Sequence, residues 1–126
     1  MKKQIIATDQ APEAIGPYSQ AVRAGNMVFT SGQIPIDPKT KSVVSDDIES
    51  QTTQVMKNLE AVLNASGLNF KNVVKTTCYL SNMDNFQAFN AVYASYFTSN
   101  PPARATIAVK TLPLNVLVEV DAIAIE

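Results

Sequence analysis

Apolar residues alternate with polar ones, or recur at helical spacing, in segments that glycine, proline and asparagine interrupt. The first segments predict short strands near Gln4–Ala7, at Ser19–Ala24 and at Met27–Ser31. Gly25 and Asn26 lie between the last two strands and favour a tight turn, so these strands should form a β-hairpin.

Two longer segments carry apolar residues at the spacing of an amphipathic α-helix. The first helix should begin at Asp46, a good N-cap, with Glu49 in the position of a capping-box carboxylate. It should end at Gly67, which suits the C′ position. Its apolar stripe comprises Ile48, Val55, Met56, Leu59, Val62 and Leu63.

The second helix should span Phe86–Phe97. Ser81 and Asp84 predict a capping box before it, and Asn100 with the two following prolines prevents its continuation. Its stripe is largely aromatic, which is far more typical of a packed core than of a ligand site. The stripe comprises Phe86, Phe89, Val92, Tyr93, Tyr96 and Phe97.

The remaining segments predict strands. Val73–Leu80 is rich in β-branched residues, and its Val74, Thr76, Cys78 and Leu80 should share one face. In the last quarter of the chain, Thr106–Leu112 and Val116–Ile125 flank Pro113-Leu114-Asn115 and predict a second hairpin. The chain of 126 residues should therefore be one two-layer α+β domain, residues 1–126, with a sheet of about six strands and two helices on one face.

The last predicted strand has two unlike faces. Its alternation gives one purely apolar face that suits the helix layer, formed by Val116, Val118, Val120, Ala122 and Ala124. The other face mixes two carboxylates with aliphatic neighbours: Leu117, Glu119, Asp121, Ile123 and Ile125. This second face is either a solvated surface or, as the aliphatic residues favour, a subunit interface with a polar pocket.

Composition excludes several classes of function. The net charge of −1 speaks against a general nucleic-acid binder, and the complete lack of histidine excludes histidine-based catalysis and histidine metal sites. The single cysteine, Cys78, cannot form an internal disulfide or a CxxC metal site. No apolar run is long enough to span a bilayer or to act as a signal peptide, so we expect a cytoplasmic protein.

Arginine is scarce, since only Arg23 and Arg104 occur beside eight lysines. Arg104 follows Pro101, Pro102 and Ala103 at the start of a predicted strand. Its guanidinium could hold a carboxylate with two hydrogen bonds, which a lysine cannot do. The alternative is an ordinary surface arginine that closes an ion pair.

Five segments in order give the chain a resemblance to a known family. The sequence is similar to the Rid family of YjgF-type reactive intermediate deaminases, also called 2-iminobutanoate/2-iminopropanoate deaminases. The resemblance covers nearly the whole chain. It rests on Ile15–Gln20, Phe29–Pro35, Val74–Thr77, Pro102–Ala105 with Leu112 and Val118–Val120 at its spacing, and the closing run Glu119–Ile125.

The resemblance implies a chorismate-mutase-like fold and a homotrimer whose clefts lie between subunits. It also implies a hydrolytic deaminase that needs no cofactor and converts enamines and imines such as 2-aminoacrylate to 2-oxo acids and ammonia. The small imine and enamine acids would be released by pyridoxal-phosphate dehydratases, and no nucleic-acid or membrane partner is implied.

By position, the resemblance assigns Arg104 to the substrate carboxylate and Glu119 to proton transfer or water activation. The residues that match the cleft lining are Tyr18, Ser31, Gly32, Asn90 and Thr106. Thr106 departs from the pattern, because many bacterial members of the deaminating branch have cysteine there. Cys78 lies elsewhere and is expected to be a small core residue.

Two other functions stay open from the sequence. The pocket could sense a metabolite in a regulatory trimer without significant turnover, and Thr106 slightly favours this alternative. Some relatives have been called translation inhibitors or ribonucleases, but the chain offers no basic stripe and no histidine for RNA cleavage.

Overall fold

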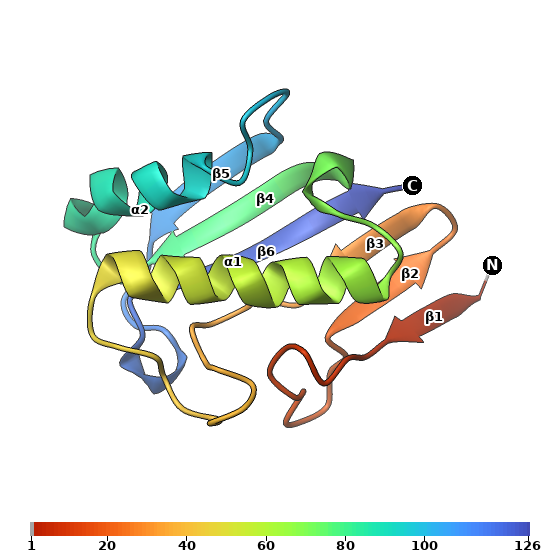
Figure 1. Cartoon of the computed structure of the whole chain (residues 1–126), viewed down its shortest axis with the longest axis horizontal. Helices are drawn as coiled ribbons and strands as arrows, with labels where there is room; N and C mark the ends of the chain where they lie inside the picture. Colours follow the sequence, from red (N-terminus) through yellow and green to blue (C-terminus); the bar gives the residue numbers. More distant parts are fainter. Residues whose placement is uncertain (1) are drawn as a thin grey trace.

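A six-stranded mixed sheet carries both α-helices on one face in the computed structural model, which describes residues 2–126 (Figure 1). The strand order is β1-β2-β3-β6-β4-β5. The predicted α+β architecture is therefore confirmed. The strands are β1 (Lys3–Ile6), β2 (Ala21–Ala24), β3 (Met27–Thr30), β4 (Val73–Leu80), β5 (Ala103–Ala108) and β6 (Val118–Ile125), and the α-helices are α1 (Ile48–Ala65) and α2 (Phe86–Ala94).

The predicted β2–β3 hairpin is confirmed, but the second predicted hairpin is wrong. The last strand, β6, pairs antiparallel with both β3 and β4, and β4 separates it from β5. β5 pairs with β4 in parallel. A parallel pair needs a crossover connection, and α2 provides it. The turn Pro113–Asn115, a 3-10 element, thus leads the chain across β4 rather than back along β5.

The first helix begins one residue later than predicted. The N-cap of α1 is Asp47, whose carboxylate accepts a hydrogen bond from the Ser50 N–H at 2.7 Å. Asp46 therefore does not cap the helix. Gly67 follows the C-cap with a φ of +79°, as its predicted C′ position requires. The predicted apolar stripe is fully confirmed, because all six of its residues are buried.

The second helix is shorter than predicted. A 3-10 turn, Met83–Asn85, precedes α2, and Asn82 rather than Ser81 caps that turn. The helix ends at Ala94, three residues before Phe97. The aromatic stripe nevertheless packs as predicted: Phe89 and Tyr93 are buried, while Phe86, Tyr96 and Phe97 pack against the core.

An irregularity at the start of β4 changes one predicted side-chain position. The pairing of β4 with β6 shifts between Val73 and Lys75. Val73 is buried and Val74 is 44% exposed, so Val74 does not share the inner face with Thr76 and Cys78. A bulge of this kind reverses the alternation locally.

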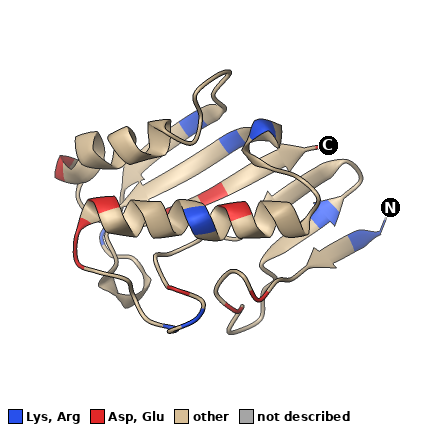
Figure 2. Ribbon diagram, viewed as in Figure 1, with Lys and Arg blue, Asp and Glu red and all other residues tan. Residues whose placement is uncertain are grey.

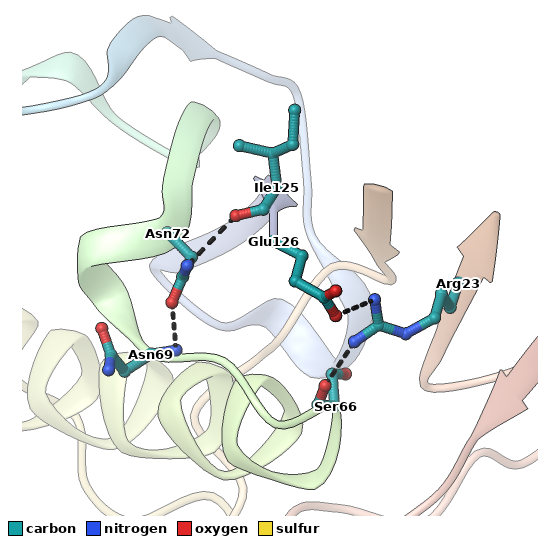
Figure 3. A network of polar contacts seen from close by, with 6 residues as sticks. All are labelled: Arg23, Ser66, Asn69, Asn72, Ile125 and Glu126. Atoms are coloured by element: carbon teal, nitrogen blue, oxygen red, sulfur yellow. Dashed lines mark hydrogen bonds and ion pairs between the residues drawn. The ribbon is translucent and has the colours of Figure 1, made fainter. Parts of the chain in front are cut away.

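Arg23 of β2 links the C-terminal end of α1 to Glu126 (Figure 3). The Arg23 guanidinium donates to the Ser66 carbonyl at 2.5 Å and pairs with Glu126 Oε1 at 3.1 Å. Asn72 donates to the Ile125 carbonyl in the same region. One of the two arginines is therefore structural.

Among residues 2–126, no helix lies on the opposite face of the sheet. Cross-strand neighbours on this face form an apolar row whose members are Ile5, Val22, Phe29 and Ile123. Beside that row lie Glu119 and Asp121, both half-buried. None of the helices in residues 2–126 is long and apolar enough to cross a membrane.

Candidate functional site

Glu119 lies on the uncovered face of the central strand β6, directly against Gly32. A Cβ atom added to Gly32 would meet the Glu119 carboxyl group, with the Glu119 Cδ at 2.8 Å. Glycine at this position therefore leaves the space that the carboxylate occupies. Burial raises the pKa of Glu119, and the neighbouring Asp121 charge raises it further. A carboxyl group with a raised pKa is suited to proton transfer near neutral pH.

Asp121 has a different environment on the same face. Its Oδ2 accepts a hydrogen bond from the Tyr79 hydroxyl at 3.1 Å. Burial raises the pKa of Asp121, and the bond from Tyr79 acts in the opposite direction. The Asp121 carboxylate thus has a hydrogen-bond partner within the chain, Tyr79, whereas the Glu119 carboxyl lies against Gly32.

Ser31 has a structural task beside Gly32. Its hydroxyl donates to the Ser19 carbonyl at 2.5 Å, and its N–H donates to the Gln20 carbonyl at 2.9 Å. These two bonds tie the segment that carries Tyr18 to the segment that carries Gly32. Tyr18 itself is 54% exposed, as a residue that contacts a ligand or a second subunit would be.

Arg104 stands on the edge strand β5, and its side chain lies along α2. Its Nη1 donates to the Asn90 Oδ1 at 2.6 Å. The guanidinium carbon lies 4.8 Å from the Tyr93 ring centroid and 5.5 Å from that of Phe86. The one ion pair within residues 2–126 joins Arg23 and Glu126, so Arg104 has no carboxylate partner there. Within the described residues, the alternative of an arginine that closes a surface ion pair therefore finds no support at Arg104.

A buried hydroxyl pair lies beneath this guanidinium. The Tyr93 hydroxyl and Thr76 Oγ1 share a hydrogen bond of 2.8 Å, in which either group can donate. The Cys78 Sγ lies 3.9 Å from the same Thr76 oxygen. Burial raises the pKa of the Cys78 thiol to about 11, so the thiol is protonated at neutral pH and is a poor nucleophile.

Thr106 lies opposite Cys78 in the β4–β5 register. Its Oγ1 is buried, and no hydrogen-bond partner for it occurs among the described residues. Thr106 also lines a surface hollow of about 420 Å³ together with Met83, Asp84, Phe86 and Gln87. A second hollow of about 450 Å³ adjoins Arg104, and its lining includes Asn90, Tyr93, Pro101 and Pro102.

The predicted site residues thus form two groups on opposite faces of one sheet. We call Tyr18, Ser31, Gly32 and Glu119 the Glu119 cluster, and Arg104, Asn90 and Thr106 the Arg104 cluster. Arg104 and Thr106 pair with Thr76 and Cys78, whose side chains are buried under the helices. Glu119 pairs with Tyr79 on the uncovered face. A single chain therefore does not bring Arg104 and Glu119 together.

The contact of Tyr93 with Arg104 goes beyond what the sequence predicts. The core stripe predicts a buried Tyr93 ring, and this is confirmed. The spacing offered a signal, because Asn90 and Tyr93 are three residues apart and so share one face of a helix. The Gly32–Glu119 contact had no local signal, since it joins distant parts of the chain.

The chain is similar to known proteins over nearly its whole length. The family described as Endoribonuclease L-PSP matches residues 8–126. Reactive Intermediate Deaminase A, chloroplastic, of Arabidopsis thaliana is 46% identical over 124 residues, which cover 98% of this chain and 66% of that protein. The Rid-family protein YyfA of Yersinia pestis superposes with a TM-score of 0.97 at 46% identity, covering 99% of this chain and 100% of that one. E. coli TdcF, solved with bound serine, superposes with a TM-score of 0.94 at 38% identity, covering 98% of each chain.

Proposed function

The chain belongs to the Endoribonuclease L-PSP family, which includes the Rid (YjgF) proteins, and on that premise we propose that it hydrolyses reactive enamine and imine acids to 2-oxo acids and ammonia. The proposed substrates are 2-aminoacrylate, 2-iminopropanoate and 2-iminobutanoate. One observation carries the proposal: the Arg104 guanidinium is fixed by an amide and two aromatic rings rather than by a carboxylate. Its charge is thus left for the carboxylate of a small ligand.

In the proposed reaction, Arg104 binds the substrate carboxylate and Glu119 handles the protons. The enamine first becomes its imine tautomer. The imine nitrogen takes a proton from solvent, and the ionised Glu119 accepts a proton from water as the water oxygen bonds to the C=N carbon. Glu119 then gives that proton to the carbinolamine nitrogen. Ammonia leaves with the C–N electron pair as the carbonyl forms, and the hydroxyl proton returns to solvent. Imine and water thus become 2-oxo acid and ammonia, with no metal or organic cofactor in the step.

We assign the assembled site to a homotrimer. Arg104 and Glu119 lie on opposite faces of the sheet in one chain. The Arg104 cluster of one copy would therefore meet the Glu119 cluster of another copy. The apolar row of Ile5, Val22, Phe29 and Ile123 on the uncovered face supports burial against a second copy. A site of this kind is complete only between subunits.

The relatives support a small amino-acid-like ligand. E. coli TdcF binds serine in its crystal structure, and serine carries a carboxylate next to a carbon that bears nitrogen. The proposed imines have the same arrangement. We further propose that the protein acts in the cytoplasm, where pyridoxal-phosphate dehydratases release such intermediates.

A coupled assay tests the proposal directly. A pyridoxal-phosphate dehydratase acting on serine or threonine generates the unstable intermediate, and release of the 2-oxo acid is followed with and without this protein. We expect release faster than the spontaneous rate, and Arg104→Ala should return it to that rate. The proposal fails if the wild-type protein gives no acceleration at any concentration.

The alternative function is a metabolite-binding regulatory trimer without significant turnover. The observation that favours it is Thr106, whose buried and unpartnered hydroxyl stands where many deaminases have cysteine. Saturable binding of a 2-oxo acid without acceleration of imine hydrolysis would establish this alternative. The basic residues, in contrast, are spread over several elements rather than gathered in a stripe, so RNA binding has little support (Figure 2).

A further inference from the structure

Tyr93 has two environments, one for its ring and one for its hydroxyl. The residue is 5% exposed, so it belongs to the core between α2 and the sheet. One ring face nevertheless lies under the Arg104 guanidinium at 4.8 Å. Its hydroxyl reaches Thr76, which is completely buried. A phenylalanine would fill the same core space without a buried hydroxyl, so the hydroxyl indicates a further task.

Thr76 stands in a position that gives this bond a consequence. Thr76 is the residue directly opposite Arg104 in the β4–β5 register. The contacts therefore run from Arg104 to the Tyr93 ring, from the Tyr93 hydroxyl to Thr76, and from Thr76 through strand pairing back to Arg104. This closed path fixes the ring relative to the strand from which the arginine extends.

We propose that Tyr93, anchored by Thr76, is the positioning residue that holds the Arg104 guanidinium ready for a ligand carboxylate. The inference rests on the proposed role of Arg104 as the carboxylate anchor. Arg104 needs such support because it is exposed on an edge strand and has a long, flexible side chain. The Tyr93 ring attracts the guanidinium cation from one face. Asn90 accepts a hydrogen bond from one of the five N–H groups of Arg104. Arg104 also lines the hollow beside Pro101 and Pro102.

The first test observes the guanidinium itself and needs no enzymatic activity. With ¹⁵N-labelled arginine the protein gives only two Nε–H signals, from Arg23 and Arg104, and Arg104→Lys assigns them. The ring current of Tyr93 should displace the Arg104 signal from the value of a free arginine. Tyr93→Leu should move it most of the way back to that value, since only the more distant Phe86 ring remains, and Thr76→Val should move it by a smaller amount. The control Tyr96→Leu removes another tyrosine that follows α2 and should leave the signal in place.

The second test measures binding of pyruvate, a small 2-oxo acid, by calorimetry. Loss of a cation–π contact corresponds to a rise in Kd of about two- to thirtyfold, which we expect for Tyr93→Leu. Thr76→Val should give a smaller rise and Tyr96→Leu none. Methyl pyruvate, which lacks the charge, should not respond to any of these changes.

The outcomes separate this inference from the proposed function. If Arg104→Ala binds pyruvate as the wild type does, the anchor role fails and this inference fails with it. If Arg104→Ala loses binding while Tyr93→Leu and Thr76→Val keep it, only the positioning role is overturned. Thr76→Val preserves side-chain volume, so it decides the question if Tyr93→Leu does not fold. An Arg104 signal that stays unchanged in folded Thr76→Val protein would also overturn the inference.

Discussion

The two arginines of the chain show how neighbours decide the task of a residue. Arg23 is held by the Glu126 carboxylate and the Ser66 carbonyl, so its charge is already used within the fold. Arg104 is held by the neutral Asn90 amide and by aromatic faces. These contacts orient its guanidinium but leave its charge uncompensated. The same residue type is thus structural at one position and suited to bind an anion at the other.

Arg104→Lys should therefore not be a conservative change. Lysine keeps the charge but cannot hold both carboxylate oxygens with a planar fork. Loss of one charge-assisted hydrogen bond predicts a fall of about ten- to hundredfold in kcat/KM for a carboxylated imine. The loss should be smaller for an imine without a carboxylate. Steady-state kinetics on both substrates measure this difference.

Arg23→Lys is the matched control for that measurement. The same chemical change at Arg23 weakens the link between α1 and the chain terminus, so it should affect unfolding and not kcat/KM. Equal hydrolysis of the carboxylated imine by wild type and Arg104→Lys would show that Arg104 does not bind the substrate carboxylate.

Glu119 and Asp121 should differ sharply in their contribution to turnover. Glu119→Gln keeps the size and hydrogen-bonding capacity but cannot transfer the proton, and such groups contribute about a hundred- to ten-thousandfold. Asp121→Asn should be much milder, because Asp121 is engaged by the Tyr79 hydroxyl. Comparison of kcat for the two folded variants tests the division of roles. Equal losses would reject it.

Cys78 should be dispensable for chemistry. Its thiol is buried, and its raised pKa of about 11 keeps it protonated at neutral pH. Cys78→Ala should lower the free energy of unfolding by about 0.5–3 kcal/mol, as core truncations do, and leave most of the turnover. Denaturant unfolding and the coupled assay measure the two effects. A folded variant without activity would bring the thiol back into the mechanism.

Single functional residues were predictable from the sequence where the residue type is unusual for its own segment of the chain. Glu119 was recognisable because a carboxylate between aliphatic neighbours is unusual in a strand, and Arg104 because arginine is rare in this chain. The structural role of Ser31 was not predictable, since only the fold shows that its hydroxyl and N–H hold the Tyr18 segment. The Tyr93 hydroxyl was equally hidden, because its partner Thr76 lies on another element.

At the scale of elements, the N-cap of α1 gives a pH-dependent prediction. Asp47→Ala should lower the urea midpoint of unfolding at neutral pH, because the Ser50 N–H loses its acceptor. The hydrogen bond from the Ser50 backbone N–H is the largest cause that lowers the pKa of Asp47 in the folded protein below its ordinary value of 3.8. The ionised cap therefore stabilises fully above pH 3.8, and its effect disappears as the pH falls through the lowered folded value.

Asp46→Ala is the matched control for this measurement, since Asp46 is the adjacent aspartate and does not cap the helix. Urea unfolding at several pH values should separate the two variants near neutral pH and bring Asp47→Ala and wild type together in strong acid. A larger effect for Asp46→Ala would contradict the observed cap.

Local patterns predicted the existence of the elements better than their pairing. The bounds of β4 agree with its run of β-branched residues, and the stripe of α1 is buried as its spacing indicated. Adjacent aspartates left the cap of α1 ambiguous by one residue. The short turn between the β5 and β6 segments predicts a hairpin of these two strands. In the sheet, β4 lies between them and pairs with β5 in parallel, which no local pattern indicates.

At the scale of the whole molecule, the sheet separates the proposed chemistry into two halves. Helices cover the face on which Arg104 extends, and the face that carries Glu119 and the apolar row is uncovered. The sequence predicted an interface from the mixed face of the last strand. It could not predict that the Arg104 cluster lies on the other face of the sheet, because that placement follows from the register of β5 against β4.

A mixing experiment decides whether the two halves meet between subunits. Arg104→Ala and Glu119→Gln should each be nearly inactive alone, since each removes one half of every site. In a trimer refolded from equal amounts of both chains, a site is intact when its arginine comes from one variant and its glutamate from the other. Random assembly predicts about a quarter of wild-type turnover. A double variant, Arg104→Ala with Glu119→Gln, mixed with wild type at the same ratio controls for dilution, and light scattering confirms the trimer. Recovery that stays at the level of the separate variants, in a mixture shown to have exchanged subunits, would mean that Arg104 and Glu119 do not share a site between subunits.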